Sequence, residues 1–396
     1  METETSRRRF LASTTAAAAT GALPASAASA PAPNVYARLG IRPVINGVGV
    51  VTHLGGSLMH QEVTRAMEDA ARCFVPLTEL QAKVGARIAE LLEAEAAMVT
   101  GGCASAITMG TVACVALGDP EKLKRLPDTS GMKNEIVQQK RHRGGYEQQM
   151  TLVGARIVWV ETKEELERAI NERTAMMFFY NEMEPEGKIT RHEWIEVGKR
   201  KGVPTFNDAA SDATPRERLF QYQKEGFDLV AFSGGKAIRG PQCSGILMGR
   251  KDLIAAALPG FNPYASIGRG MKVGKEEMIG LLAAIERYLK ADHDGEMREL
   301  EARVHEIRDG LAGIDGLTTE RYMPPIANHV PHVLVNWTED ACLLNTGEVT
   351  RRLMQGDPPI AVSGFGERRL KISVWMMQPG EHKLVLGRLR EIFKPA

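Results

Sequence analysis

The chain has almost no net charge, no paired cysteine motif and no histidine cluster. Its 396 residues include 50 basic and 49 acidic side chains, so charge does not direct it to nucleic acid or to an anionic membrane. The five cysteines are scattered, no CxxC pair occurs, and the histidines lack the spacing of metal ligands. The sequence therefore predicts no metal site, free thiols that are mostly buried, and a small-molecule substrate rather than a nucleic acid.

Heptads, solenoid periods and low-complexity tracts are also missing beyond the N-terminus, which argues against coiled coils and repeat architectures. A chain of this length with 43% hydrophobic residues can bury a large core. It is too long for one small domain. We therefore expect a globular protein with two unequal domains.

The N-terminus has the order of an export signal. Residues 6–11, SRRRFL, precede an apolar run at 11–23 and the small residues ASAASA at 25–30. The apolar run is too short to span a bilayer. We expect residues 1–30 to be a twin-arginine signal that delivers the folded protein to the periplasm through the twin-arginine translocation machinery. The alternative is an alanine-rich tail in which the arginines occur by chance.

The strongest chemical signal is a lysine on a glycine turn between two apolar runs. Residues 231–248 are AFSGGKAIRGPQCSGILM, which places Lys236 between two predicted strands. Asp208 ends another apolar run, VPTFNDAA at 203–210, and precedes the lysine by 28 residues. A lysine that forms an imine and an acid that keeps a pyridine nitrogen protonated are what a pyridoxal phosphate enzyme needs. Asp212 is the competing acid, and the turn alone is more often a solvated loop than a cofactor site.

A second motif suits a phosphate group. Residues 96–100 predict a short strand that leads into Gly101 and Gly102 and then into a helix over 104–117. The free N–H groups and the dipole at such a helix start favour an anion. Cys103 and Ser105 lie in the same turn, where the Ser105 hydroxyl is either a phosphate donor or a plain helix cap.

Four segments together resemble a known family. SGGKAIRGPQ at 233–242, NGVGVVTHLGGS at 46–57, TGGCASAI at 100–107 and IGRGMKVGKEE at 267–277 are similar to motifs of the selenocysteine synthase-like branch of the fold type I enzymes that depend on pyridoxal phosphate. That branch includes D-glucosaminate-6-phosphate ammonia-lyase-type proteins. The resemblance extends over most of residues 42–390.

This resemblance implies an α/β fold with two domains. We expect an N-terminal arm at 31–60, a large cofactor-binding domain with a mostly parallel sheet at 61–270, and a linker helix with a small α+β domain at 271–396. It further implies pyridoxal 5′-phosphate as the cofactor and at least a homodimer, because fold type I sites usually lie between two subunits.

The alternation of predicted elements agrees with a doubly wound sheet. We expect one helical stretch over 61–93 and a polar loop over 118–133. The other expected helices lie near 164–171, 193–201, 275–289, 296–311 and 380–393. Beyond the strands already given, we expect strands at 135–140, 155–160, 175–180, 330–336 and 369–375.

The resemblance also implies roles for individual side chains. We expect His142 to stack on the cofactor ring, with a solvated basic turn as the alternative, and Ser233 and Arg239 to bind the cofactor phosphate. Arg239 is otherwise a plain surface charge. The candidate substrate-binding residues are Asn46, Thr52, His53, Arg269, Lys272 and Arg369, with Arg368 as an alternative to Arg369.

The expected reaction is an α,β-elimination that releases ammonia from a β-hydroxy amino acid or an amino sugar acid, through an aldimine with Lys236 and a quinonoid. Three alternatives stay open: a selenium transferase acting on seryl-tRNA, an amino acid racemase, and an exported protein that binds the cofactor or an amino acid without turnover. The export signal argues against the tRNA substrate. So does the short distance between that signal and the first glycine-rich motif, which leaves no room for a separate tRNA-recognition domain.

Overall fold

The computed structural model describes residues 35–393. The expected export signal at 1–30 lies outside the described residues. The chain divides into two units, Met1–Pro43 and Val44–Ala396. Of the first unit, the structure describes a 3-10 helix, η1, at Val35–Leu39.

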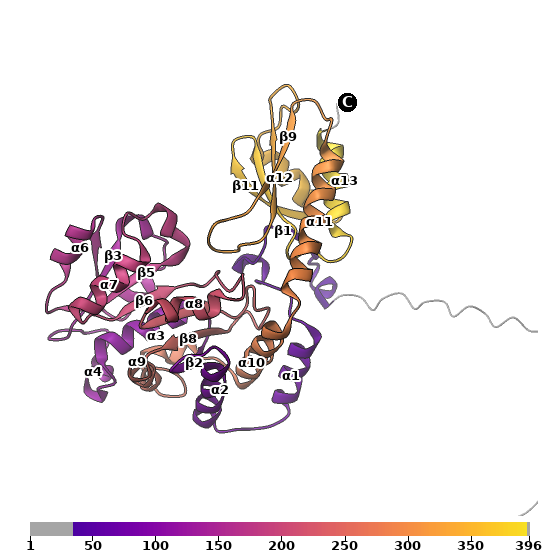
Figure 1. Cartoon of the computed structure of the whole chain (residues 1–396). Helices are drawn as coiled ribbons and strands as arrows, with labels where there is room; N and C mark the ends of the chain where they lie inside the picture. Colours follow the sequence, from indigo (N-terminus) through magenta and orange to yellow (C-terminus); the bar gives the residue numbers. More distant parts are fainter. Residues whose placement is uncertain (1–34, 394–396) are drawn as a thin grey trace, which may run out of the picture. The chain divides into compact units, whose positions relative to one another are not determined.

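A seven-stranded sheet forms the first half of the second unit (Figure 1). Its strands β3 to β7 are all parallel, whereas β8 runs antiparallel to both of its neighbours, β2 and β7. Across the sheet the order is β2 (Ala96–Thr100), β8 (Gly245–Gly249), β7 (Leu229–Ser233), β6 (Thr205–Asp208), β5 (Thr174–Tyr180), β3 (Glu135–Gln139) and β4 (Arg156–Val160). The expected mostly parallel α/β fold is confirmed.

Helices accompany this sheet along the chain, in the alternation that the sequence predicts. They are α1 (Gln61–Ala71), α2 (Leu77–Leu91), α3 (Cys103–Ala116), α4 (Pro120–Arg125), α5 (Gln148–Thr151), α6 (Lys163–Ala169), α7 (Arg191–Lys201), α8 (Arg218–Glu225), α9 (Lys251–Ala257) and α10 (Lys275–Lys290). Every residue of α3 except Ala104 is buried. This helix is apolar on all sides because the sheet, α5 and α9 surround it.

Two local expectations are wrong. Residues 61–93 form two helices rather than one, because Pro76 stands at the N-cap of α2 and a proline cannot continue a helix from the preceding turn. The polar segment 118–133 contains α4, which Asp119 caps by accepting hydrogen bonds from the backbone N–H groups of Glu121 and Lys122.

A five-stranded sheet and three helices follow. The order is β1 (Ile45–Gly47), β11 (Ile360–Gly366), β12 (Arg369–Ser373), β10 (His332–Trp337) and β9 (Leu317–Tyr322). The helices are α11 (His293–Leu311), α12 (Thr346–Gln355) and α13 (Glu381–Phe393). Strand β1 comes from the expected N-terminal arm and pairs in parallel with β11, so this sheet joins an early segment of the described chain to a late one (Figure 1).

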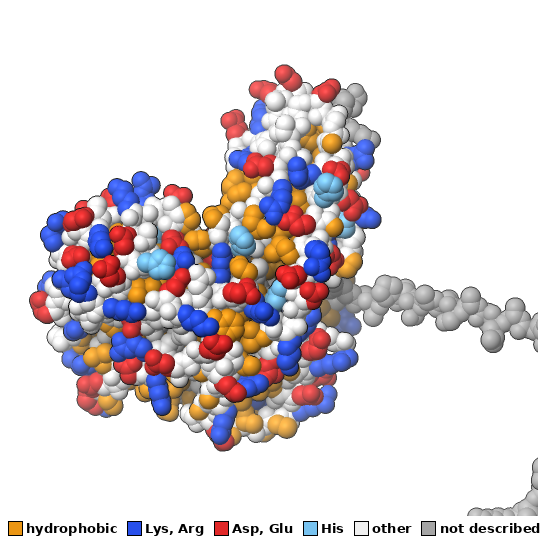
Figure 2. Space-filling model, in the orientation of Figure 1, with side chains coloured by type: hydrophobic (Ala, Val, Ile, Leu, Met, Phe, Trp, Pro, Cys, Tyr) orange, Lys and Arg blue, Asp and Glu red, His pale blue; other side chains and the backbone are white. Residues whose placement is uncertain are grey.

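The short 3-10 helices of the second unit are η2 (Thr52–Leu54), η3 (Lys140–His142), η4 (Asn181–Glu186), η5 (Leu258–Gly260) and η6 (Ile267–Met271). Within residues 35–393, no helix is long and apolar enough to cross a membrane. Basic and acidic side chains are interspersed on the face drawn in Figure 2. That distribution agrees with the nearly balanced charge of the whole chain.

Candidate active site

Lys236 lies in a cavity of about 450 Å³ at one edge of the seven-stranded sheet. Strands β2, β6 and β7 all end there, as ligand crevices in open α/β sheets do. The cavity brings together several of the residues expected from the sequence, namely Thr52, Gly101, Gly102, Cys103, Asp208, Ser233 and Lys236. We call it the lysine cavity.

The lysine turn is shaped by close backbone contacts. A Cβ atom on Gly235 would lie 2.6 Å from the Cα of Gln242, and one on Gly234 would lie 2.1 Å from the Oγ of Ser244. Both positions therefore require glycine. The turn presents Lys236 so that its Nζ donates a hydrogen bond to Ser211 Oγ at 2.5 Å. Ser211 is a contact that the sequence motifs did not indicate.

Asp208 is the acid of this cavity. Its carboxyl is 2% exposed and accepts hydrogen bonds at 3.1 Å from the thiol of Cys103 and from the backbone N–H of Ala210. Burial raises the pKa of Asp208 above its ordinary value, although the Cys103 hydrogen bond and the nearby Lys236 act in the opposite direction.

Asp212, the competing acid, holds two segments of the chain together. Its carboxylate accepts hydrogen bonds from the backbone N–H of Ala327 at 2.7 Å and from Asn181 at 3.0 Å, and it pairs with Arg218. Burial raises the pKa of Asp212 to about 6. It does not line the lysine cavity. Asp212 instead fixes the loop after β9 against the segment that follows β6.

The start of α3 faces the same cavity. The first hydrogen bond of the helix joins the N–H of Ala106 to the carbonyl of Gly102, so the N–H groups of residues 103–105 have no partner within the helix. Gly102 is in the left-handed region at φ 120°, which favours glycine. The Ser105 hydroxyl is buried and has no hydrogen-bond partner. An unpaired donor at a helix start is suited to an anionic ligand.

Cys103 is held as a donor to Asp208. Burial raises the pKa of the thiol well above its usual range, so it stays protonated. We expect Cys103→Ala to raise the pKa of Asp208 and to lower kcat/KM several-fold on the acid side of the pH profile. Cys103→Ser keeps a hydrogen-bond donor to Asp208, so the acid side of its kcat/KM pH profile should match that of the wild type. Identical pH profiles for the alanine variant and the wild type would contradict this role.

His142 does not stack in the lysine cavity. It is fully buried, packs edge-to-face on Phe179 with the ring centroids 4.5 Å apart, and accepts a hydrogen bond from the backbone N–H of Tyr180. Burial lowers the pKa of His142 to about 4. The aromatic ring that lines the cavity is Tyr146, four residues later, after two glycines. An aromatic side chain directly after a predicted ligand turn was the signal that could have identified it.

The N-terminal glycine-rich segment closes over the lysine turn. Gln242 donates a hydrogen bond to the carbonyl of Thr52, and Ser57 donates one to the carbonyl of Gly235. Arg239 donates from Nε to the carbonyl of Leu58, so its side chain holds this segment rather than lining the cavity.

Asn46 and His53 also lie outside the lysine cavity. The side chain of Asn46 bonds to the backbone of Val48 and Gly49 and so shapes the turn after β1. His53 is exposed on η2.

The other basic residues expected at the substrate are elsewhere in the described chain. Arg269 and Lys272 are exposed and line a separate cavity with Cys243. Arg369 forms an ion pair with Glu320 across the five-stranded sheet, and Arg368 donates to the carbonyls of Cys342 and Leu344. None of these four side chains lines the lysine cavity.

Thiols and metals complete the electrostatic description. Cys103 and Cys114 are buried and Cys342 is partly buried, but Cys73 and Cys243 are exposed, so the expectation of burial is wrong for these two. Over residues 35–393 no group of three His, Cys, Asp or Glu side chains is arranged to hold a metal ion.

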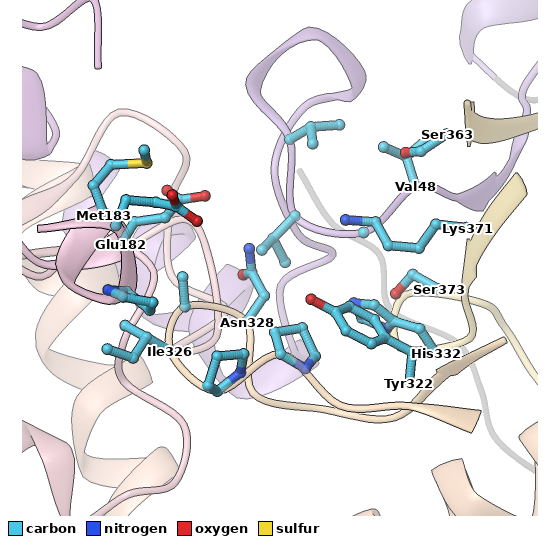
Figure 3. A pocket seen from close by; sticks show the side chains of 18 of the residues that line it. Val48, Glu182, Met183, Tyr322, Ile326, Asn328, His332, Ser363, Lys371 and Ser373 are labelled. Atoms are coloured by element: carbon cyan, nitrogen blue, oxygen red, sulfur yellow. The ribbon is translucent and has the colours of Figure 1, made fainter. Parts of the chain in front are cut away.

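A larger cavity of about 700 Å³ lies next to the lysine cavity, and Val50 lines both. Its walls come from the turn after β1, from η3 and η4, and from the five-stranded sheet (Figure 3). Polar side chains that the sequence analysis did not select line it: Glu182, Tyr322, Asn328, His332, Ser363, Lys371 and Ser373. We call it the distal cavity.

Known proteins are similar to this chain in sequence and fold. A D-glucosaminate-6-phosphate ammonia lyase from Salmonella typhimurium is 31% identical over 380 residues, which cover 92% of this chain and 99% of the relative. The chain belongs to the selenocysteine synthase-like branch of the fold type I pyridoxal phosphate enzymes. The family model for L-seryl-tRNA selenium transferase matches residues 150–308. The solved structure of D-glucosaminate-6-phosphate ammonia-lyase superposes with a TM-score of 0.80 at 30% identity, over 91% of this chain and 98% of that one.

Other members of this branch have different chemistry. A 5′-C-glycyluridine monooxygenase-decarboxylase from a Streptomyces species is 31% identical over 373 residues, covering 90% of this chain and 91% of the relative. An L-seryl-tRNA(Sec) selenium transferase from Maridesulfovibrio salexigens is 30% identical over 299 residues, covering 64% of this chain and 58% of the relative. Membership of the branch makes the chain an enzyme with pyridoxal 5′-phosphate as its cofactor.

The residues of the lysine cavity fit that cofactor. They supply an amine at Lys236, a buried carboxyl at Asp208, and an anion site at the start of α3, where Gly102, Cys103 and Ala104 line the cavity. Ser105, which the sequence analysis expected at the phosphate, does not line the cavity, although its buried hydroxyl lacks a partner. A Cβ on Gly101 would lie 2.8 Å from the carbonyl oxygen of Met271, so the wall beside the anion site also requires glycine. A cavity of about 450 Å³ lies within the usual range for small-molecule sites.

Proposed function

We propose that the protein is a lyase that releases ammonia from an amino sugar acid or another β-hydroxy amino acid by α,β-elimination. The observation that carries the proposal is the lysine cavity itself, in which Lys236 and the buried Asp208 face one space. The near-complete overlap with an ammonia lyase supports the same reaction class. A small anionic amino acid agrees with the nearly balanced charge of the chain, which does not favour nucleic acid.

When bound, pyridoxal phosphate supplies an electron sink for the electrons released at the substrate α-carbon. Lys236 is the base that takes the α-proton at Nζ, and the Ser211 hydroxyl, 2.5 Å away, orients that amine. The protonated Lys236 then donates to the departing β-hydroxyl, which leaves as water. Asp208 would keep a proton on the cofactor's ring nitrogen, because a buried carboxylate strongly favours a neighbouring cation. The unsaturated amine that remains takes up a proton at its β-carbon and is hydrolysed by one water, so the net products are a 2-keto acid and ammonia.

Product analysis distinguishes this reaction from that of the oxygen-dependent relative. Purified protein with added pyridoxal phosphate would be given 2-amino-2-deoxy-D-gluconate, its 6-phosphate, and D- and L-serine. We expect equal amounts of ammonia and 2-keto acid from at least one of them, without oxygen uptake. Oxygen uptake with release of carbon dioxide would favour a monooxygenase-decarboxylase. Inversion of the α-carbon without ammonia would favour a racemase, and binding without any product would favour a non-catalytic protein.

We also propose export through the twin-arginine route, on the order of charge, apolar run and small residues at 6–30. The test is fractionation of cells that produce the full chain. The mature protein should be found in the periplasm, and replacement of both Arg7 and Arg8 by lysine should retain it in the cytoplasm. Equal export of the variant would contradict the proposal.

We propose a homodimer as well. Phe74 is fully exposed and Val75 is 43% exposed in the segment between α1 and α2, where a second chain would cover them. Light scattering on the purified protein should give twice the mass of one chain. Replacement of both residues by serine should shift the equilibrium toward the monomer, and a monomeric wild type would contradict the proposal.

A further inference from the structure

The distal cavity is lined on one side by a polar face of the five-stranded sheet. Tyr322 and Ser373 flank His332 across neighbouring strands, and directly opposed residues of antiparallel strands point to the same side. Lys371 lies two residues before Ser373 and opposite Ser363, so both share that side. Figure 3 shows these five side chains together at the cavity wall. The polar face thus draws on four strands and is interrupted by the buried Leu334, which lies opposite Lys371 on β10.

Apolar residues make up the opposite face of the same strands. Val333, Val335, Leu370 and Ile372 are fully buried, and α11 packs on β9 and β10. The alternation in β12 therefore separates a core face from a cavity face. A sheet with one apolar and one polar face is ordinary where the polar face meets water. Here the polar face meets a cavity instead, and some of its side-chain polar atoms have no hydrogen-bond partner.

Two polar atoms in the cavity wall lack partners. His332 is 4% exposed and its Nδ1 forms no hydrogen bond, and the Oδ1 of Asn328 is buried and also unpaired. Buried polar atoms without partners are rare in native proteins and indicate a missing water or ligand. Asn328 is held at φ 49° with its backbone N–H bonded to the Ser211 carbonyl, so its position is tied to the lysine cavity.

Lys371 supplies a cation without a counter-charge. Its neighbour on the same strand face, Arg369, pairs with Glu320, whereas no carboxylate of the described residues forms an ion pair with Lys371. The Lys371 ammonium instead lies 5.4 Å from the centroid of the Phe365 ring. The opposite side carries both signs of charge, because Lys140, Arg141 and Arg143 line it together with Glu182 and Glu186. On the sheet side, Lys371 is the cation that lines the cavity and has no carboxylate partner among the described residues, so an anionic group is favoured there.

Together these groups describe a ligand with hydroxyls along its length and an anion at its far end. The Asn328 amide lines the cavity and suits a hydroxyl, and burial lowers the pKa of His332 to about 4, so a neutral imidazole is available as a further hydroxyl partner. A serine-sized substrate held at Lys236 would not fill this cavity, whereas a longer chain could extend past Val50, which lines both cavities.

We propose that the distal cavity binds the hydroxylated chain of the substrate and that Lys371, with Ser363 and Ser373, binds its terminal anion. This inference rests on the proposed function for the identity of the reacting end, and it names the substrate class as an acyclic sugar acid with an anionic far end. The anion is either a phosphate monoester or a carboxylate, since both suit a lysine flanked by hydroxyls.

Binding without turnover tests the proposal first. Three compounds that lack the reacting amine differ at the far end of the chain. D-gluconate 6-phosphate ends in a phosphate, D-glucarate in a carboxylate and D-gluconate in a neutral alcohol. Calorimetry on the holoenzyme should show that one of the two anionic compounds binds at least about tenfold tighter than gluconate. The tighter of the two identifies the anion. Equal binding of all three would overturn the proposal.

The matched variants are Lys371→Met and Arg369→Met. They replace basic residues on one strand face, but only Lys371 lines the distal cavity. Lys371→Met should abolish the preference for the anionic compound, Lys371→Arg should restore part of it, and Arg369→Met should keep it. An unchanged preference in Lys371→Met would overturn the proposal. Anion-selective binding by a wild type that releases no ammonia would sink the proposed reaction and leave this site standing.

Discussion

Lys236→Ala should lower the rate of ammonia release by at least about a thousandfold, because the variant lacks both the amine that holds the cofactor and the base that moves the α-proton. The fold should be unchanged, since the Lys236 side chain hydrogen-bonds only to Ser211 in the described chain. The measurement is steady-state ammonia release at saturating pyridoxal phosphate. Lys251→Ala, which removes an exposed lysine at the start of α9, is the control and should retain full activity.

Added methylamine offers a sharper version of this test. If the missing group is the Lys236 amine, a small amine in the buffer should restore part of the lost rate to Lys236→Ala and none to an Asp208 variant. A Lys236→Ala protein that keeps more than about a tenth of the wild-type rate would remove the lysine from the mechanism.

Asp208→Asn should lower kcat by at least about a hundredfold, because an amide of the same shape cannot carry the charge that keeps the ring nitrogen protonated. Asp208→Glu should restore part of the rate. Asp212→Asn is the matched comparison: it changes a second buried acid that hydrogen-bonds to Asn181 and Ala327 outside the lysine cavity. We expect this variant to melt at a lower temperature and to keep most of its kcat.

Asp208 and Asp212 lie four residues apart in the chain. If Asp212 rather than Asp208 were the acid at the ring nitrogen, the two variants would give the opposite results. If Asp212→Asn lost the turnover and Asp208→Asn kept it, Asp212 would be the acid at the ring nitrogen. The hydrogen bond from the Cys103 thiol to Asp208 would then have a purely structural role.

The lysine cavity was largely predictable because each of its parts is encoded locally. A strand that ends at Asp208, a strand that ends at the glycine turn before Lys236, and the Gly101–Gly102 helix start are short patterns. Parallel strands bring their carboxyl ends to one edge of a sheet, so the sequence could place these parts together before the structure did.

The distal cavity could not be predicted in this way. Its walls come from residues 48–51, 140–143, 182–186 and 322–375, and only the strand registers of the five-stranded sheet bring them together. The sequence pointed to Arg369 as a substrate residue because arginine suits a carboxylate. The alternation along β12 puts Arg369 and Lys371 on one side of the sheet. Arg369 forms an ion pair with Glu320, and of the two basic residues only Lys371 lines the distal cavity.

His142 illustrates a third limit. A basic tripeptide after a strand is as compatible with a buried ring as with an exposed one, and the environment of His142 depends on Phe179 and Tyr180 of another strand. The break between α1 and α2, by contrast, could have been predicted from Pro76, because a proline interrupts a helix. The regular spacing of apolar residues on both sides of Pro76 led to the prediction of one helix.

The most direct test of the whole account is the absorption spectrum of the purified protein before and after borohydride reduction, followed by peptide mapping. We expect a visible band that reduction removes, with the cofactor then fixed to the peptide that contains Lys236. A protein that shows no such band after incubation with pyridoxal phosphate, or that carries the reduced label on another lysine, would contradict the assignment of the lysine cavity as the cofactor site.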